Sequence, residues 1–233
     1  MIYQLFFTLL TFVGFLTPVL AQEKEKAPPV QFRAVFHNPA NPIADLFYAD
    51  KSGVIVPLNF RPKSLTEALF TRPVNGSLVL YDKKNVDPEN PSASVAASIK
   101  LSPNTKRAMV LVLPSLPGKK PAYRMLVIDD SAKAFPKGES RALLLIDVKA
   151  AIVAGEHRLP VDPGKLVKVP PVKKVNQYNM AQTNFYYQKG GSWRVFTERQ
   201  LQYHNAYRRL FIIHATPGAL TPSVTTIVDT TRR

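Results

Sequence analysis

The hydrophobic residues of this chain fall into short runs that alternate with polar clusters. After residue 21, no segment keeps apolar residues at helical spacing over three turns. Runs of Val, Ile, Leu, Tyr and Phe recur between clusters of Pro, Gly, Asn, Asp and Ser, which is typical of an all-β sandwich or barrel. A short helical turn is expected only at 64–70. The runs predicted as strands are 32–36, 54–60, 77–81, 95–101, 108–113, 123–128, 142–148, 166–169, 184–188, 193–197, 209–214 and 225–228.

An approximate internal repeat with a spacing of 100 residues indicates two domains of one kind. Four features recur in the same order 100 residues later. They are Leu101, the run 110–113, the turn Pro117-Gly118 and Asp129, which correspond to Leu201, the run 210–213, Pro217-Gly218 and Asp229. We predict two tandem immunoglobulin-like β-sandwich domains at 31–130 and 139–230, after a flexible segment of charged residues and Pro at 22–30. A single fused sandwich is the alternative, because few of the aligned positions are identical.

Two short strings follow each other in this sequence, Val127-Ile128-Asp129-Asp130-Ser131 and Phe135-Pro136-Lys137-Gly138. Through them the chain resembles a group of exported bacterial β-sandwich proteins. The resemblance covers residues 54–229 and includes the Pro163-Gly164 turn and a late strand at 207–211. No activity is known for that group. The resemblance therefore implies export and β architecture, and it implies nothing about chemistry.

The first 21 residues have the organisation of a secretory signal peptide. An apolar run from Leu5 to Leu16 precedes Pro18 and the small-residue cleavage site that ends at Ala21. The run is shorter than the ~20 residues that span a bilayer. We expect cleavage after Ala21 and export to the periplasm, the cell surface or the medium, with no transmembrane span in the mature chain. An uncleaved N-terminal anchor is the alternative.

Composition narrows the classes of site and partner. The chain has no cysteine, which excludes disulfides, thiolate metal sites and a cysteine nucleophile. Lys and Arg outnumber Asp and Glu by 31 to 16, a net charge of +15. Residues 22–116 hold 12 basic and 8 acidic residues, whereas residues 117–233 hold 19 and 8. The basic C-terminal half favours an anionic polymer or an envelope protein as partner, and export argues against nucleic acid.

The chain has few groups for catalysis, and we assign no catalytic residue, metal site or cofactor. The four histidines, none at a metal-ligand spacing, are His37, His157, His204 and His214. Only His204 and His214 are placed to face each other across a hairpin. Asp129 and Asp130 are adjacent carboxylates, but neighbours on a strand point to opposite faces. We expect Asp130-Ser131 to end a strand and open a turn, with the Asp130 side chain bonding a backbone N–H two residues on.

Basic and aromatic residues are interleaved in the C-terminal half. Aromatic rings beside cations are typical of sites for anionic polymers, which bind by stacking and charge neutralisation. Strand alternation separates Trp193 and Val195 from Arg194, so we expect Trp193 in the core and Arg194 outside. The residues named as anion-binding candidates are Lys165, Lys168, Lys173, Lys174, Arg194, Arg208 and Arg209.

These observations predict a non-enzymatic, exported, envelope-associated binding or structural protein that contacts an anionic partner through its C-terminal half. Two alternatives remain. A periplasmic assembly chaperone would have an open cleft between its domains and an exposed apolar edge strand, although the anchoring Arg and Lys motifs of such chaperones are absent. An exported hydrolase on a β scaffold would need a concave pocket around a perturbed carboxylate or histidine.

Overall fold

The computed structural model of the protein describes residues 27–40, 42–43 and 45–230. The predicted signal peptide, and the first part of the segment 22–30, lie outside the described residues. Strands make up most of the regular structure, and the described residues contain one short 3-10 helix, η1 (Pro91–Ser94). No helix in the described part of the chain is long and apolar enough to cross a membrane.

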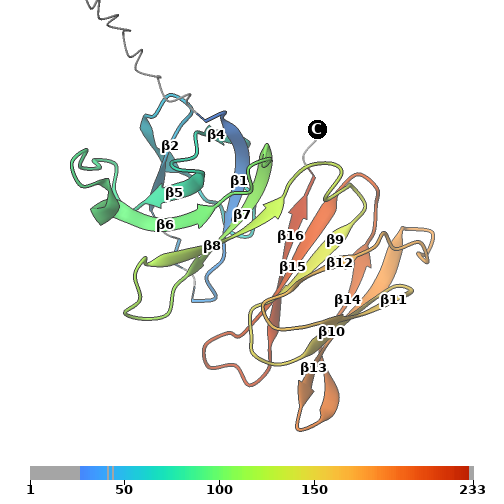
Figure 1. Cartoon of the computed structure of the whole chain (residues 1–233). Helices are drawn as coiled ribbons and strands as arrows, with labels where there is room; N and C mark the ends of the chain where they lie inside the picture. Colours follow the sequence, from blue (N-terminus) through green and yellow to red (C-terminus); the bar gives the residue numbers. More distant parts are fainter. Residues whose placement is uncertain (1–26, 41, 44, 231–233) are drawn as a thin grey trace, which may run out of the picture.

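Eight strands of the N-terminal half form two four-stranded sheets (Figure 1). The strands are β1 (Val30–Phe36), β2 (Leu46–Ala49), β3 (Ile55–Leu58), β4 (Leu69–Thr71), β5 (Ser77–Tyr81), β6 (Val95–Lys100), β7 (Arg107–Pro114) and β8 (Tyr123–Asp129). One sheet has the order β4-β1-β7-β8 and the other β3-β2-β5-β6. Alternate side chains of both sheets, among them Phe32, Leu80 and Val110, form one apolar core.

The C-terminal half has the same architecture. Its strands are β9 (Ser140–Leu144), β10 (Ala150–Ala154), β11 (His157–Val161), β12 (Leu166–Val169), β13 (Met180–Lys189), β14 (Ser192–Gln202), β15 (Arg208–His214) and β16 (Ser223–Asp229). The sheets have the orders β12-β9-β15-β16 and β11-β10-β13-β14. A second core, which includes Ile152, Phe185 and Phe211, comes entirely from this half. The predicted all-β sandwich fold is confirmed.

The two halves repeat one strand topology, eight strands apart. Each sheet order of the first half becomes a sheet order of the second when eight is added to every strand number. In each half the first and seventh strands pair in parallel, as β1 with β7 and β9 with β15. Each half also has a β-bulge between its fifth and sixth strands, where Ala96 and Phe196 are the extra residues. The spacing of 100 residues therefore corresponds to a structural repeat that covers all eight strands.

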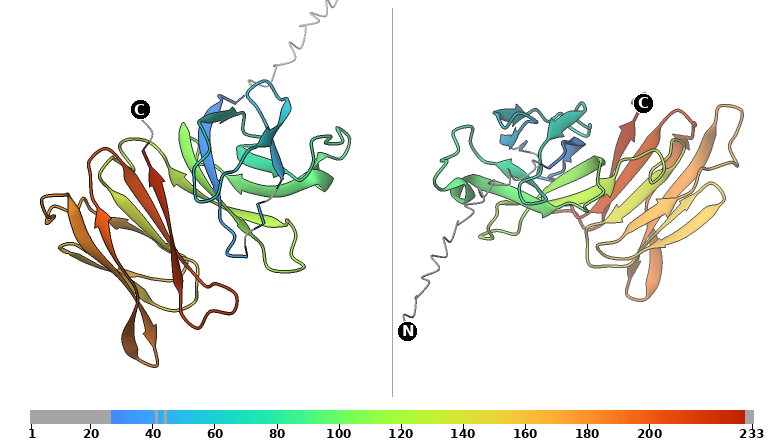
Figure 2. Two further views of the ribbon diagram at one scale, coloured as in Figure 1. Left: turned by 180° about the vertical axis from the view of Figure 1, so that it is seen from behind. Right: turned by 45° about the horizontal axis from the view of Figure 1, so that its top comes forward.

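A third apolar cluster lies between the two halves, which lie side by side in Figure 2. Along β7, Val110 packs in the N-terminal core and its neighbour Leu111 packs in this third cluster; along β15, Phe211 and Ile212 divide in the same way. Strands buried on both faces have continuous apolar runs instead of alternation, as these two do. The buried members of the third cluster are Val35, Met109, Leu111, Leu113, Ile128, Phe135, Leu143, Leu210, Ile212 and Ile227.

Each predicted run overlaps a strand, but β2, β4, β10 and β11 were not predicted. Strand β10 is rich in alanine, which has low β propensity, and β11 contains Pro160, which is tolerated because β11 is an edge strand. The helical turn expected at 64–70 is wrong. That segment contains an isolated bridge from Arg61 to Ser64 and the beginning of β4.

Candidate functional site

The seven basic residues named as candidates do not form one surface. Arg208 and Arg209 are buried, with 2% and 6% of their surface exposed. Arg209 donates to the carbonyl of Gln202 and lies over the rings of Tyr203 and Tyr207. Arg208 belongs to an internal ion network. Neither side chain is available to an external anion, which corrects the prediction for these two residues.

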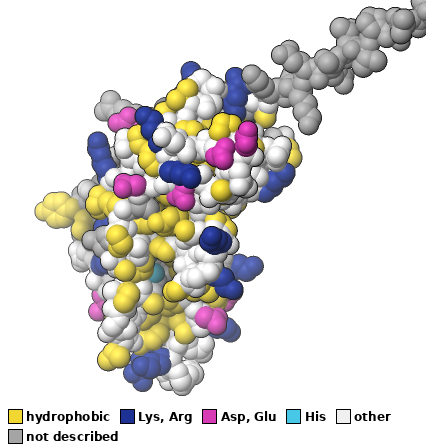
Figure 3. Space-filling view, turned by 90° about the vertical axis from the view of Figure 1, so that its left-hand side faces the viewer, with side chains coloured by type: hydrophobic (Ala, Val, Ile, Leu, Met, Phe, Trp, Pro, Cys, Tyr) yellow, Lys and Arg dark blue, Asp and Glu magenta, His cyan; other side chains and the backbone are white. Residues whose placement is uncertain are grey.

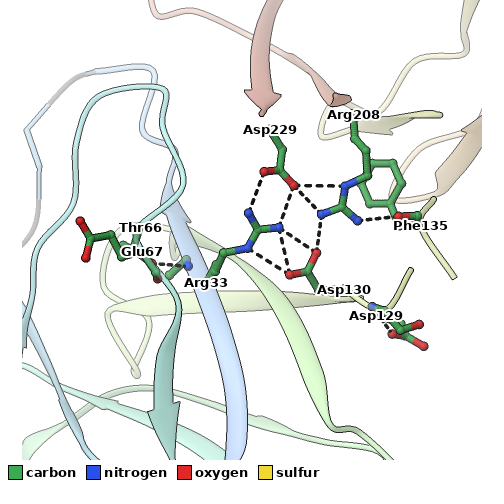
Figure 4. Close-up of polar contacts among 10 residues, drawn as sticks. Arg33, Thr66, Glu67, Asp129, Asp130, Phe135, Arg208 and Asp229 are labelled. Carbon is green, nitrogen blue, oxygen red and sulfur yellow. Dashed lines mark hydrogen bonds and ion pairs between the residues drawn. The ribbon is translucent and has the colours of Figure 1, made fainter. Parts of the chain in front are cut away.

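The ion network joins the two halves (Figure 4). Arg33 of β1 donates to Asp130 at 3.0 and 3.1 Å and to Asp229 at 2.7 Å through two nitrogens. Arg208 of β15 donates to the same two carboxylates and, at 2.6 Å, to the carbonyl oxygen of Phe135. Its guanidinium also lies 4.3 Å from the centre of the Phe135 ring. Two positive and two negative charges thus balance among deeply buried side chains.

Each carboxylate of the network is held in its charged form. Burial alone would raise the pKa of Asp130 and of Asp229, but hydrogen bonds from Arg33 and Arg208 and their positive charges hold both pKa values below the usual range. Burial alone would lower the pKa of Arg33, and the two aspartates raise it. Because the charges are satisfied internally, we assign the network to joining the halves.

Asp129 and Asp130 have separate structural roles, as the alternation of side chains predicted. Asp130 enters the ion network, whereas Asp129 is exposed. The carboxylate of Asp129 accepts a hydrogen bond at 2.8 Å from the backbone N–H of Ser131, two residues on, and so opens the turn after β8. The turn bond predicted for Asp130 is therefore wrong: Asp129 makes it, because the carboxylate of Asp130 is buried and bonded to Arg33.

Lys168 is also engaged inside the protein, although 56% of its side chain is exposed. Its Nζ lies 2.6 Å from one oxygen of Glu139, whose other oxygen lies 2.9 Å from a guanidinium nitrogen of Arg141. The side chain of Glu139 is only 1% exposed. Lys168 therefore neutralises a buried carboxylate and does not present a free charge.

The other four candidates are exposed and make no ion pair within the described residues. They are Lys165, Lys173, Lys174 and Arg194. Lys165 precedes β12 and Lys173 follows it, so these two lie at opposite ends of that strand, while Arg194 lies on β14 of the other sheet. On the side of the molecule shown in Figure 3, Lys and Arg side chains are scattered among acidic and apolar ones. A single basic patch is not visible there.

Lys173 and Lys174 form the best-defined exposed pair. The carboxylate of Glu156 accepts hydrogen bonds from their backbone N–H groups at 2.8 and 3.0 Å. Burial alone would raise the pKa of Glu156, but these and other backbone hydrogen bonds, with the neighbouring His157, lower it to about 2. The backbone is therefore fixed without use of either ammonium group.

Trp193 lies outside the core, contrary to the prediction. Strands β13 and β14 shift register at Phe196, which has no partner on β13. The extra residue breaks strict alternation, so Phe196 packs into the core against Phe185. Trp193 and Val195 are 50% and 46% exposed. One irregularity of the backbone thus places the only tryptophan of the chain at the surface.

Trp193 borders a groove of about 540 Å³ on the sheet β11-β10-β13-β14. This sheet lies on the side of the C-terminal sandwich away from the N-terminal half (Figure 1). The groove is lined by Ala151, Arg158, Leu159, Pro160, Tyr186 and Trp193, which come from all four strands. Arg158 is exposed and has no ion pair among the described residues. Arg158 and Ala151 were not among the predicted site residues, because their strands were not predicted and their faces could not be assigned.

Two histidines meet between the halves, but they are not the pair expected from the sequence. His37 and His214 lie edge to face with their ring centres 4.5 Å apart, whereas His204 stacks on Tyr207. The nitrogens of His214 contact Thr225 and the backbone, while Nε2 of His37 is buried with no partner in the described part of the chain. Burial and then the neighbouring His214 lower the pKa of His37 to about 4.

The histidine pair borders a cavity of about 390 Å³ at the junction. Its lining includes Lys63, Ser223 and several apolar side chains, but no carboxylate. The described residues also contain no group of three or more His, Asp or Glu side chains that could hold a metal ion. The titratable side chains that line this cavity are therefore His37, His214 and Lys63.

Two features of the C-terminal sandwich are therefore open to a partner. They are the exposed pair Lys173 and Lys174 and the groove beside Trp193. Among the described residues, Lys173, Lys174 and Arg158 make no ion pair, and Trp193 lies outside the core. No protein-family model matches this chain, and no curated protein matches it.

Proposed function

We propose that this chain is a non-enzymatic, exported β-sandwich protein of the cell envelope that binds an anionic partner through its C-terminal half. The observation that carries the proposal is the exposed pair Lys173 and Lys174. Glu156 holds the backbone at both residues, and their ammonium groups make no ion pair in the described part of the chain. A fixed backbone with two free cations attracts anions with little loss of chain entropy on binding.

The two alternatives have less support. An assembly chaperone was expected to have an open cleft between its domains, but the junction holds an apolar cluster and a complete ion network. Strand β14 is an edge strand with exposed apolar side chains, which favours this alternative. A hydrolase was expected to have a perturbed carboxylate or histidine in a concave pocket. His37 meets that condition alone, without a carboxylate beside it.

The proposal is tested by retention of the full mature chain on heparin and polyphosphate resins. The variant K173E/K174E reverses the charge of the exposed pair. It keeps the hydrogen bonds to Glu156, because the backbone N–H groups and not the side chains donate them. The matched control K83E/K84E reverses another adjacent exposed pair, in the N-terminal half, with the same change in net charge. We expect K173E/K174E to elute at clearly lower salt than K83E/K84E, with thermal stability nearly unchanged for both.

Equal elution of the two variants would show that retention follows net charge alone, and the proposal would then fail. Export is tested separately, by N-terminal sequencing of protein recovered from the envelope fraction of the producing cell. We expect the mature chain to begin at Gln22. Protein that begins at Met1 would contradict the proposed cleavage.

A further inference from the structure

The two sandwiches carry the same row of side chains across the outer face of corresponding sheets. In the C-terminal half the row is Pro160, Ala151, Tyr186 and Val195, as strand pairing defines it. In the N-terminal half the corresponding row is Pro57, Phe47, Tyr81 and Val95. Three of the four residue types agree, and in both rows the tyrosine and the valine lie next to the bulge. The N-terminal half therefore serves as an internal reference for this face.

The rows differ where the groove opens. Ala151 stands where the N-terminal half has Phe47, so the C-terminal row has a methyl group in place of a ring. The second difference is Trp193, on β14, since the equivalent part of the N-terminal half belongs to the short helix η1. A missing ring in the floor and an added ring at the side produce the groove.

The chemistry of the groove points to a ring-shaped ligand with a negative charge. Trp193 and Tyr186 offer aromatic faces that attract the C–H groups of a saturated ring. Arg158 offers a planar guanidinium that matches a carboxylate. Side-chain amides follow along β13, where Gln182 donates to Asn184 at 2.7 Å and Asn184 approaches the hydroxyl of Tyr186 at 3.5 Å. Amides of this kind can bind hydroxyl groups.

A peptide strand has less to bind here. Strands β10 and β13, which form the middle of the face, are each paired on both sides, so their backbone groups are already used. Strand addition, which depends on free backbone groups, is therefore not available within the groove. A nucleic acid strand needs a series of cations along its phosphates, and Arg158 is the one cation among the lining residues.

We infer that this groove binds an acidic polysaccharide, with one uronic-acid ring against Trp193 and Tyr186 and its carboxylate on Arg158. The inference rests on the proposed function, because it names the anionic partner and the place where one unit of it binds. It assigns the recognition to Arg158 and the two rings. The exposed pair Lys173 and Lys174 would then attract other anionic units of the same polymer.

The test uses the fluorescence of the full mature chain, in which Trp193 is the only tryptophan. The probes are a hexamer of galacturonic acid and, as the neutral control, a hexamer of galactose. We expect the acidic hexamer to shift the emission of Trp193 and to protect it from acrylamide quenching. No change in emission or quenching up to millimolar hexamer would overturn the inference, and this measurement needs no variant.

Two variants locate the site by calorimetry. A151F places in the groove the residue that the N-terminal half carries at the equivalent position, and we expect it to weaken both hexamers about tenfold or more. R158Q should weaken the acidic hexamer about tenfold and leave the neutral one within about twofold. K173E/K174E changes more charge, at two residues that do not line the groove, and should weaken hexamer binding less than R158Q does. An A151F or R158Q variant that binds the acidic hexamer like the parent would contradict the site.

The outcomes for the groove and for the proposed function can be told apart. If the hexamers leave Trp193 unaffected while resin retention still depends on Lys173 and Lys174, the groove inference is wrong and the proposed function stands. If a deoxythymidine oligonucleotide or polyphosphate alters Trp193 as strongly as the acidic hexamer does, the assignment to a saccharide is wrong. Among the three anionic probes, a response of Trp193 to the acidic hexamer alone, lost in A151F, is the result expected.

Discussion

Substitution of Arg33 by Met tests whether the buried ion network holds the two halves together. R33M removes one of the two guanidinium groups that bond Asp130 and Asp229, and Arg208 supplies the other. All four side chains are at most 7% exposed, so the remaining negative charge cannot be solvated. Loss of one partner of a buried ion pair typically destabilises by about 3–5 kcal/mol. For a chain of this length we therefore expect the melting temperature to fall by roughly 10 °C.

The assay is urea unfolding at neutral pH, followed by circular dichroism. The exposed Arg61 provides a matched control, and R61M should change the free energy of unfolding by no more than about 0.5 kcal/mol. The double variant R33M/D229N restores charge balance, since Arg208 and Asp130 remain paired. We expect its loss to be smaller than the sum of the single losses by about 2 kcal/mol. Strict additivity, or an R33M variant as stable as R61M, would refute the reasoning.

The network also has a pH signature. The pKa values of Asp130 and Asp229 are held below the usual value of 3.8 in the folded protein. Their contribution to stability is therefore fully present above the unfolded pKa, near pH 4, and is lost as pH falls through the lower folded values. R33M should show a weaker dependence on pH in this acid range than the parent. An unchanged acid profile would argue against charge as the cause.

Two further predictions concern the histidine pair and one glycine. The pKa of His37 is about 4 in the folded protein and 6.5 when unfolded, so protonation of His37 opposes folding, and stability falls by about 3 kcal/mol as pH drops from 6.5 to 4. H37F should flatten the profile of stability against pH between these values. A slope like that of the parent would exclude His37 as its source. Gly155 has φ +54°, and an added Cβ would lie 2.3 Å from a side-chain carbon of Val172. Gly164 has a similar φ of +69°, but no atom lies within 4 Å of an added Cβ, so G155A should destabilise more than G164A. Equal melting temperatures of the two variants would show that Val172 moves aside.

The order of short apolar runs and Pro-rich clusters was enough to predict the class of fold. Alternation is a local property, since each residue on a strand points to the face opposite its neighbour, and it can be recognised without knowledge of the partner strands. The spacing of 100 residues was visible for the same reason, because the last two strands of each half agree in length to within one residue and keep their turn. Strand β4, which is short, and strand β10, which is rich in alanine, lack such a signal and were not predicted.

The candidate site depended on contacts that no local pattern contains. Arg208 and Lys165 look alike in the sequence, yet Arg208 is buried because its partners Asp130 and Phe135 are 78 and 73 residues away. A single extra residue at Phe196 directed Trp193 outward, and the sequence does not mark a bulge. The groove collects side chains from four strands between residues 151 and 193. Composition and periodicity therefore determined that the chain forms β-sandwiches with a basic C-terminal half. Tertiary packing decided which charged side chains are neutralised and which remain free, because neutralisation depends on the distance between charges in space.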